Sequence, residues 1–174
     1  MSRLLIASTL LWLLVAACAG GRSCGKISLS PAAATSVADI RGTAGFPLVL
    51  PWACDSRLLV TAVFEDAIPE QGALLPRVNF VVGRSGERAF IFSQTRALLP
   101  FSQIPQSTHP LRASAAGVSA DGFAGPAGTG EDIAYLRWRS GDVTFELSAT
   151  LRPWLSEADV RTLAEGLMGR SPHG

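Results

Sequence analysis

The residues suited to acid–base or nucleophilic chemistry are few and lie far apart in the chain. There are two histidines, His109 in a proline-rich segment and His173 next to the last residue. A hydrolytic triad needs a histidine base that is held by a carboxylate beside a nucleophile. The string from Gly117 to Asp121 contains Ser119 but lacks the second glycine of a nucleophile elbow. We therefore expect a protein that is not an enzyme, with His173 in a terminal tail.

Acidic side chains occur in short pairs, which raises the question of carboxylate chemistry or metal binding. Glycoside hydrolysis needs two carboxyl groups opposed across a bond, and sequence spacing does not establish that geometry. Solvation and helix capping explain each pair. The sequence contains no calcium-loop motif and no glycine motif that would hold a phosphate. We expect no metal site and no cofactor. The pairs are Glu65-Asp66, Glu131-Asp132 and Glu157 with Asp159.

One row of side chains has the composition of a binding surface. Tyr135, Arg137 and Arg139 alternate along a predicted strand and would point outward from the same face. Tyrosine and arginine are enriched at binding hot spots, so the row is our candidate binding site; a solvated sheet face is the alternative. Trp52 and Trp154 each follow a proline and would either close the ends of the core or line a cleft between sheet and helix.

Residues 1–17 have the organisation of a secretory signal peptide. Arg3 provides the positive start, and an apolar run extends from Leu4 to Val15. A membrane-spanning helix needs about 20 predominantly apolar residues, so the pattern favours a cleaved signal over a retained anchor.

The end of this signal resembles a known modification site. Val15-Ala16-Ala17-Cys18 is similar to the lipobox of bacterial lipoproteins, in which an aliphatic residue and two small residues precede a cysteine. The resemblance implies cleavage before Cys18 and attachment of lipid to its thiol. It also implies an extracytoplasmic protein anchored to a bacterial cell membrane. The alternative is an ordinary signal peptide cut near Ala17, Ala19 or Gly20.

Lipidation of Cys18 would leave an even pair, Cys24 and Cys54, of the three cysteines in the chain. Outside the cytoplasm such a pair is expected to form a disulfide. Closing this loop would contribute about 3–4 kcal/mol on the chain-entropy model. The alternative is two separate thiols.

Length and composition favour one folded domain with a real core. The chain has 174 residues, of which 48% are hydrophobic and 17% charged, and its formal net charge is +1. This hydrophobicity argues against intrinsic disorder. The sequence contains no cluster of basic residues, so we expect no nucleic-acid partner.

The pattern of elements predicts an α+β domain. We expect a short N-terminal helix from Pro31 to about Arg41, an antiparallel sheet, and a C-terminal helix packed on one face of that sheet. The predicted organisation is a signal at 1–17, a tether at 18–29, one domain at 30–169 and a tail at 170–174. The predicted strands are 46–51, 58–65, 77–83, 88–94, 132–139 and 143–150, with a weak strand at 111–118 and a flexible loop at 120–130.

The layout of residues 45–168 resembles uncharacterised extracytoplasmic domains of bacterial lipoproteins and anti-sigma-associated proteins. The residues that carry the resemblance are Gly45, Phe46, Pro51, Trp138, Gly141 and the run from Leu155 to Leu167. The resemblance implies a non-enzymatic envelope domain and transfers no catalytic residue.

Two functions compete at this point. The leading hypothesis is a lipid-anchored, non-catalytic binding or sensing module whose partner is an unknown protein or wall component. The alternative is a carrier of an apolar small molecule or lipid held between sheet and helix, because residues 58–65 are apolar on both faces.

Overall fold

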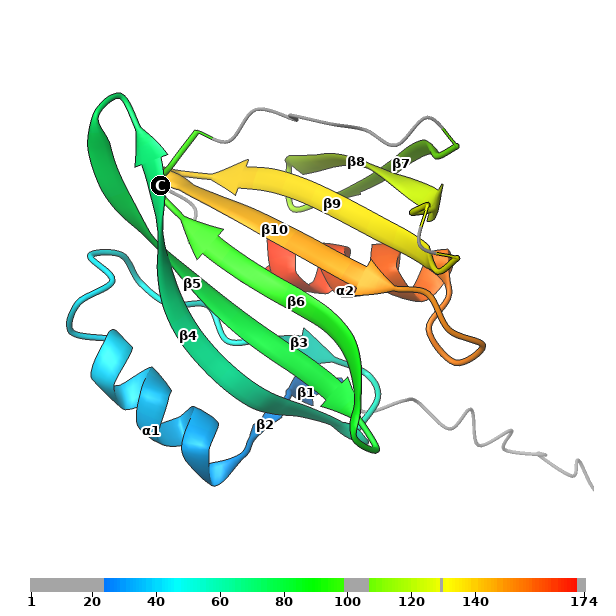
Figure 1. The fold of residues 1–174 in the computed structure, drawn as a ribbon. Helices are drawn as coiled ribbons and strands as arrows, with labels where there is room; N and C mark the ends of the chain where they lie inside the picture. Colours follow the sequence, from blue (N-terminus) through cyan, green and yellow to red (C-terminus); the bar gives the residue numbers. More distant parts are fainter. Residues whose placement is uncertain (1–23, 99–106, 129, 172–174) are drawn as a thin grey trace, which may run out of the picture.

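The computed structural model describes residues 24–98, 107–128 and 130–171, which form a strongly twisted mixed β-sheet with two helices (Figure 1). Eight strands are hydrogen-bonded in the order β2-β4-β5-β6-β10-β9-β8-β7, and β1 pairs separately with β3. The first half of the chain contains β1 (Gly25–Lys26), β2 (Ser28–Leu29), α1 (Pro31–Ile40), β3 (Trp52–Ala53), β4 (Leu58–Glu70) and β5 (Ala73–Arg84). The second half contains β6 (Glu87–Thr95), β7 (His109–Ala115), β8 (Val118–Pro126), β9 (Asp132–Ser140), β10 (Val143–Thr150) and α2 (Glu157–Met168).

The fold class agrees with the α+β expectation in outline and differs in two details. The sheet is mixed, since β2 runs parallel to β4 while the other neighbouring strands are antiparallel. The helix predicted from Pro31 is present as α1, with the Ser30 hydroxyl accepting a hydrogen bond from the Ala33 amide. However, α1 is the third element and not an N-terminal helix, because β1 and β2 precede it.

The ends predicted to be tether and tail are partly built into the fold. Residues 25–29 pair with β3 and β4, and the disulfide at Cys24 fixes their start. At the other end, Ser171 is buried and its hydroxyl donates to the Leu167 carbonyl. Residues 1–23, which include Cys18, and residues 172–174 lie outside the described part of the chain.

Tight turns explain the hairpins. The β5–β6 connection is Ser85-Gly86 and the β7–β8 connection is Ala116-Gly117. All four residues have positive φ, which two-residue hairpin turns of type I′ require at both positions. The β9–β10 hairpin has the predicted strands and alternation, with Gly141 in its turn at φ 59°.

Two predictions about irregular and strand segments were wrong. The weak strand predicted at 111–118 is present in large part as β7, but most of the flexible loop predicted at 120–130 belongs to β8, which pairs with it. A Cβ at Gly122 would lie 1.8 Å from the Tyr135 carbonyl oxygen, so glycine is needed there for close strand approach and not for flexibility. Residues 46–51, predicted as a strand, do not form one; the Gln94 side chain instead hydrogen-bonds the Val49 amide (2.9 Å) and carbonyl (2.6 Å).

The core lies on one face of the sheet, beneath α2. In Figure 1, α2 runs behind β10 and β9, and its buried face joins the same core cluster as Ala33 and Val37 of α1. Aromatic rings fill the centre of this cluster: Trp138 stacks on Phe145 at 5.5 Å, and Phe92 lies 6.0 Å from both rings. The helix begins with a capping box between Ser156 and Asp159. The α2 residues in the core are Val160, Leu163, Ala164, Leu167 and Met168.

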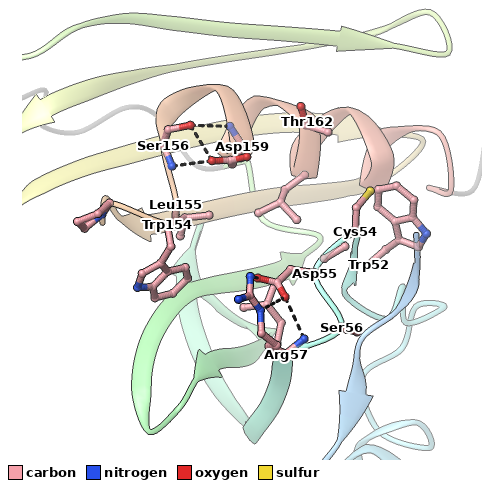
Figure 2. Close-up of a pocket in the computed structure, with 14 residues that line it drawn as sticks. Trp52, Cys54, Asp55, Ser56, Arg57, Trp154, Leu155, Ser156, Asp159 and Thr162 are labelled. Atoms are coloured by element: carbon pink, nitrogen blue, oxygen red, sulfur yellow. Dashed lines mark hydrogen bonds and ion pairs between the residues drawn. The ribbon is translucent and has the colours of Figure 1, made fainter. Parts of the chain in front are cut away.

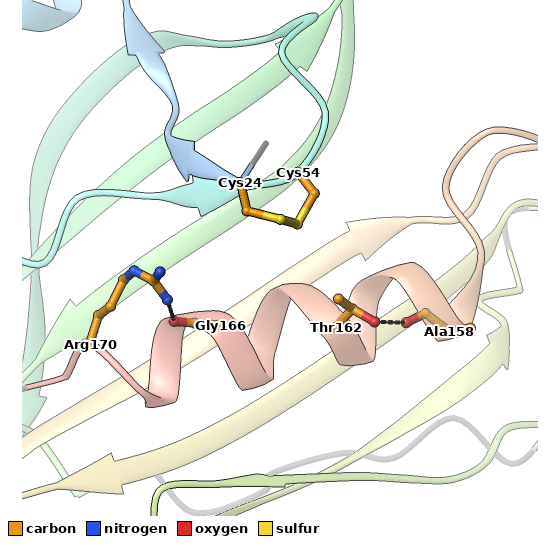
Figure 3. The surroundings of a disulfide bond; sticks show 6 residues. All are labelled: Cys24, Cys54, Ala158, Thr162, Gly166 and Arg170. Carbon is orange, nitrogen blue, oxygen red and sulfur yellow. Dashed lines mark hydrogen bonds between the residues drawn. A yellow bond between two sulfur atoms is a disulfide. The ribbon is translucent and has the colours of Figure 1, made fainter. Parts of the chain in front are cut away.

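Cys24 and Cys54 form the expected disulfide, which joins the start of the described chain to the segment after β3. Figure 3 shows this bond facing the side of α2 that carries Thr162 and Gly166.

No helix within the described part of the chain is both long enough and apolar enough to cross a membrane.

Candidate functional site

A recess with a volume of about 450 Å³ lies on the sheet face opposite the core. Alternation along β4, β5, β6, β9 and β10 points its side chains away from α2, and strand register brings them together. We call this recess the sheet-face pocket. It is lined by Phe64, Asp66, Arg77, Asn79, Ile91, Ser93, Tyr135, Arg137, Glu146 and Ser148.

Glu146 forms the centre of the pocket and is only 8% exposed. The Arg137 Nη2 group donates to its carboxylate at 2.7 Å, and the Tyr135 hydroxyl donates to the same oxygen. Arg137 Nη2 also donates to the Tyr135 hydroxyl oxygen at 2.6 Å. Burial, followed by the negative charge of Glu146, raises the pKa of Tyr135 above its ordinary value. The phenol is therefore held neutral as a hydrogen-bond donor.

A second group of polar side chains adjoins the first. Arg77 Nε donates to the Asp66 carboxylate at 2.8 Å, and Asn79 donates to the same carboxylate at 3.1 Å. Ser93 in turn donates to the side-chain amide oxygen Oδ1 of Asn79 at 2.7 Å. The Arg77 guanidinium lowers the pKa of Asp66, and it also lies 3.9 Å from Glu146, which links the two groups. Two cations and two anions thus form one continuous network.

The structure brings together two of the three residues that were predicted to form a binding row. Tyr135 and Arg137 line the pocket, whereas Arg139 is exposed further along β9 and donates to the Thr144 hydroxyl at 3.0 Å. Sequence reasoning missed Glu146 as their partner, although its outward position opposite Arg137 followed from the hairpin register. The binding role of all three residues stays a prediction.

A second recess, of about 740 Å³, lies between α2 and the segment that joins β3 to β4. We call it the tryptophan cleft, because Trp52 and Trp154 lie at opposite ends of the group drawn in Figure 2. Asp55 and Arg57 lie on one side of this group, and Asp159 and Thr162 project from α2 on the other. The remaining lining residues are Ala53, Cys54, Ser56, Leu58, Pro153, Leu155, Ser156 and Leu163.

Both indole rings of the cleft are held by an arginine. The Arg170 Cζ atom lies 4.0 Å from the centre of the Trp52 ring, and Arg84 Cζ lies 4.7 Å from that of Trp154. Trp52 also packs so closely on α2 that a Cβ at Gly166 would lie 2.2 Å from its ring.

The charges near the cleft are paired. The Arg57 guanidinium makes two hydrogen bonds to Asp55, at 2.8 and 2.9 Å, and these lower the pKa of Asp55. Arg84 Nη1 lies 3.6 Å from the same carboxylate. Asp159 accepts hydrogen bonds from the amide and hydroxyl of Ser156.

Neither His109 nor Ser119 lines either recess, and His173 lies outside the described residues. His109 meets Glu157 at 3.1 Å on the surface, where the histidine side chain is 57% exposed. Ser119 is paired opposite Ser114 in the β7–β8 hairpin. Within 24–98, 107–128 and 130–171, no group of three or more His, Cys, Asp or Glu side chains is placed to hold a metal ion.

No family model, no curated protein and no solved structure matches this chain.

Proposed function

We propose that this chain is a lipid-anchored, non-catalytic protein of the bacterial cell envelope that binds a protein or wall component through the sheet-face pocket. The observation that carries the proposal is the network around Glu146, in which Tyr135, Arg137, Arg77 and Asp66 converge from three strands of the sheet, β9, β5 and β4. Side chains that are already ordered by mutual hydrogen bonds lose little conformational entropy when a partner binds.

The pocket also has the anatomy of a binding hot spot. Its tyrosine and arginines are half-buried, and Phe64 at the rim is 45% exposed, although it is a large apolar side chain. The partner we expect is uncharged overall where it enters the pocket, because the two arginines are already neutralised by Asp66 and Glu146.

The anchoring part of the proposal rests on the sequence of residues 1–18. We propose cleavage before Cys18, lipid on its thiol and an extracytoplasmic location. The carrier alternative has less support, because Phe92, Trp138 and Phe145 occupy the space between the sheet and α2.

Photo-crosslinking in the native envelope tests the binding surface. A photoreactive phenylalanine analogue at position 64 lies at the rim of the pocket, and the same analogue at Leu74, which is 72% exposed but does not line the pocket, is the matched control. We expect a discrete adduct from position 64 alone, and its loss when Arg137→Leu is added. Equal adducts from both positions, or none from position 64, would contradict the proposal.

Intact mass spectrometry of the same protein, extracted gently from membranes, tests the anchor. We expect a chain that begins at Cys18 and carries the mass of attached lipid. An unmodified chain that begins elsewhere would show that the protein is not lipid-anchored.

A further inference from the structure

We propose that the tryptophan cleft is a second binding site, and that its ligand is a neutral saccharide. The cleft shares no lining residue with the sheet-face pocket, so the inference goes beyond the function proposed above. Its volume of about 740 Å³ falls within the roughly 300–1,000 Å³ typical of small-molecule sites.

The two indoles identify the first property of the ligand. Trp52 and Trp154 are half-buried, line the cleft and come from its opposite ends (Figure 2). Indole rings are large, rigid and apolar, so they favour ligands that present flat apolar surfaces. A pyranose ring presents such a surface, because its C–H groups gather on one face while its hydroxyl groups project from the edge.

The polar groups between the indoles identify the second property. The Asp55 carboxylate and the hydroxyl groups of Ser56 and Thr162 line the same cleft. Carboxylates accept hydrogen bonds and hydroxyl groups both donate and accept them, which is the complement that sugar hydroxyl groups require. Asp55 already accepts hydrogen bonds from Arg57, and the Thr162 hydroxyl donates to the Ala158 carbonyl at 3.0 Å while its oxygen can still accept one from a ligand.

The charge balance of the cleft disfavours anionic ligands. Arg57 and Arg84 both approach the Asp55 carboxylate, and the Asp159 carboxylate accepts a hydrogen bond from the Ser156 amide at the start of α2. Among the residues that the structure describes, Arg57 is the one arginine or lysine that lines the cleft, and its guanidinium already holds Asp55 through two hydrogen bonds. A phosphate or carboxylate ligand would therefore need to break an existing ion pair, whereas an uncharged polyhydroxylated ligand would not.

The walls of the cleft are fixed before any ligand binds. The disulfide at Cys54 anchors one wall, and the close contact of Trp52 with Gly166 anchors that ring on α2 (Figure 3 shows the disulfide beside this part of the helix). Arg84 stacks on Trp154 at the other end. Such preorganisation reduces the entropy that binding must overcome.

Calorimetric titration of the full chain tests the proposal. The protein is extracted from membranes in a detergent without a sugar head group, and it is titrated with maltohexaose, cellohexaose, chitohexaose, mannohexaose and, for comparison, a heparin hexasaccharide. We expect at least one neutral hexasaccharide to bind with Kd below about 1 mM and to bind more tightly than the sulfated one. Trp154→Ala should then weaken that binding at least tenfold, and Tyr135→Phe in the sheet-face pocket should leave it unchanged.

A second variant keeps the test decisive if Trp154→Ala does not fold. Thr162 is exposed on α2 and lines the cleft, so Thr162→Arg introduces a long side chain there with little disturbance of the helix. We expect this variant to lose saccharide binding while its thermal unfolding stays close to that of the native chain. Failure of all four neutral hexasaccharides to bind at 1 mM, or equal affinity in the native chain and Thr162→Arg, would overturn the proposal. Neither outcome would affect crosslinking at position 64, so the two proposals fail separately.

Discussion

Replacing Glu146 by glutamine removes the charge at the centre of the sheet-face pocket while keeping the shape of the side chain. The Glu146 and Arg137 side chains are 11% and 14% exposed and lie 2.7 Å apart, so the pair is screened little by water. A hydrogen bond to a charged group contributes about 1.5–3 kcal/mol, against about 0.5–1.5 kcal/mol for a neutral one. We therefore expect Glu146→Gln to lower the free energy of unfolding by about 1–2 kcal/mol, or Tm by about 2–8 °C.

The matched control is Asp121→Asn, which makes the same chemical change at an exposed ion pair. Asp121 and Arg112 lie 3.4 Å apart with side chains 67% and 82% exposed, and such pairs contribute about 0–1 kcal/mol. Urea denaturation of both variants, followed by far-UV circular dichroism, gives the comparison. A Glu146→Gln variant as stable as Asp121→Asn would refute the reasoning, because the network would then contribute no more than a solvated surface pair.

Three further predictions concern the pocket, the disulfide and the cleft. Tyr135 is the single tyrosine, so absorbance at 295 nm reports its ionisation. Because burial raises the pKa of Tyr135 in the folded state, we expect the midpoint of its titration above pH 10 in native protein and near pH 10 in urea. Its contribution to the free energy of unfolding should be complete below about pH 10 and lost as the pH rises further. Replacing Cys24 and Cys54 together by serine should lower the free energy of unfolding, measured by chemical denaturation, by about 3–4 kcal/mol. Adding reductant to the native chain should reproduce that loss. Gly166→Ala should displace the Trp52 ring, lowering stability by about 1–3 kcal/mol and changing tryptophan fluorescence; an unchanged emission spectrum would contradict the close packing.

The elements that the sequence predicted well are those specified by local pattern. In β9 and β10, strict alternation and the glycine turn at Gly141 define both strands and the face that each side chain occupies. The start of α2 is equally local, since Ser156 and Asp159 form the capping box that their spacing indicates.

The β7–β8 hairpin shows where local pattern failed. The weak strand predicted at 111–118 is present as β7, but the glycines and small residues at 120–130 were interpreted as a flexible loop, and most of them form β8. Gly122 is required by contact with the Tyr135 backbone of β9, a neighbour that the local sequence does not identify. The strand predicted at 46–51 is absent for the opposite reason. These residues have the composition of a strand, but the side chain of Gln94, distant in sequence, hydrogen-bonds the Val49 backbone groups in place of a neighbouring strand.

The sequence by itself determined the alternation that points Tyr135, Arg137 and Glu146 away from the core. It predicted the disulfide between Cys24 and Cys54 with two separate thiols as the alternative, and the structure shows the disulfide. Tertiary structure decided which charges meet, because the strand order places Arg77 of β5 and Glu146 of β10 on either side of β6, with their charged groups 3.9 Å apart. It also decided that Trp52 and Trp154 share one cleft. Periodicity specifies the face on which a side chain lies, whereas the order of strands and the docking of α2 depend on the packing of the whole core.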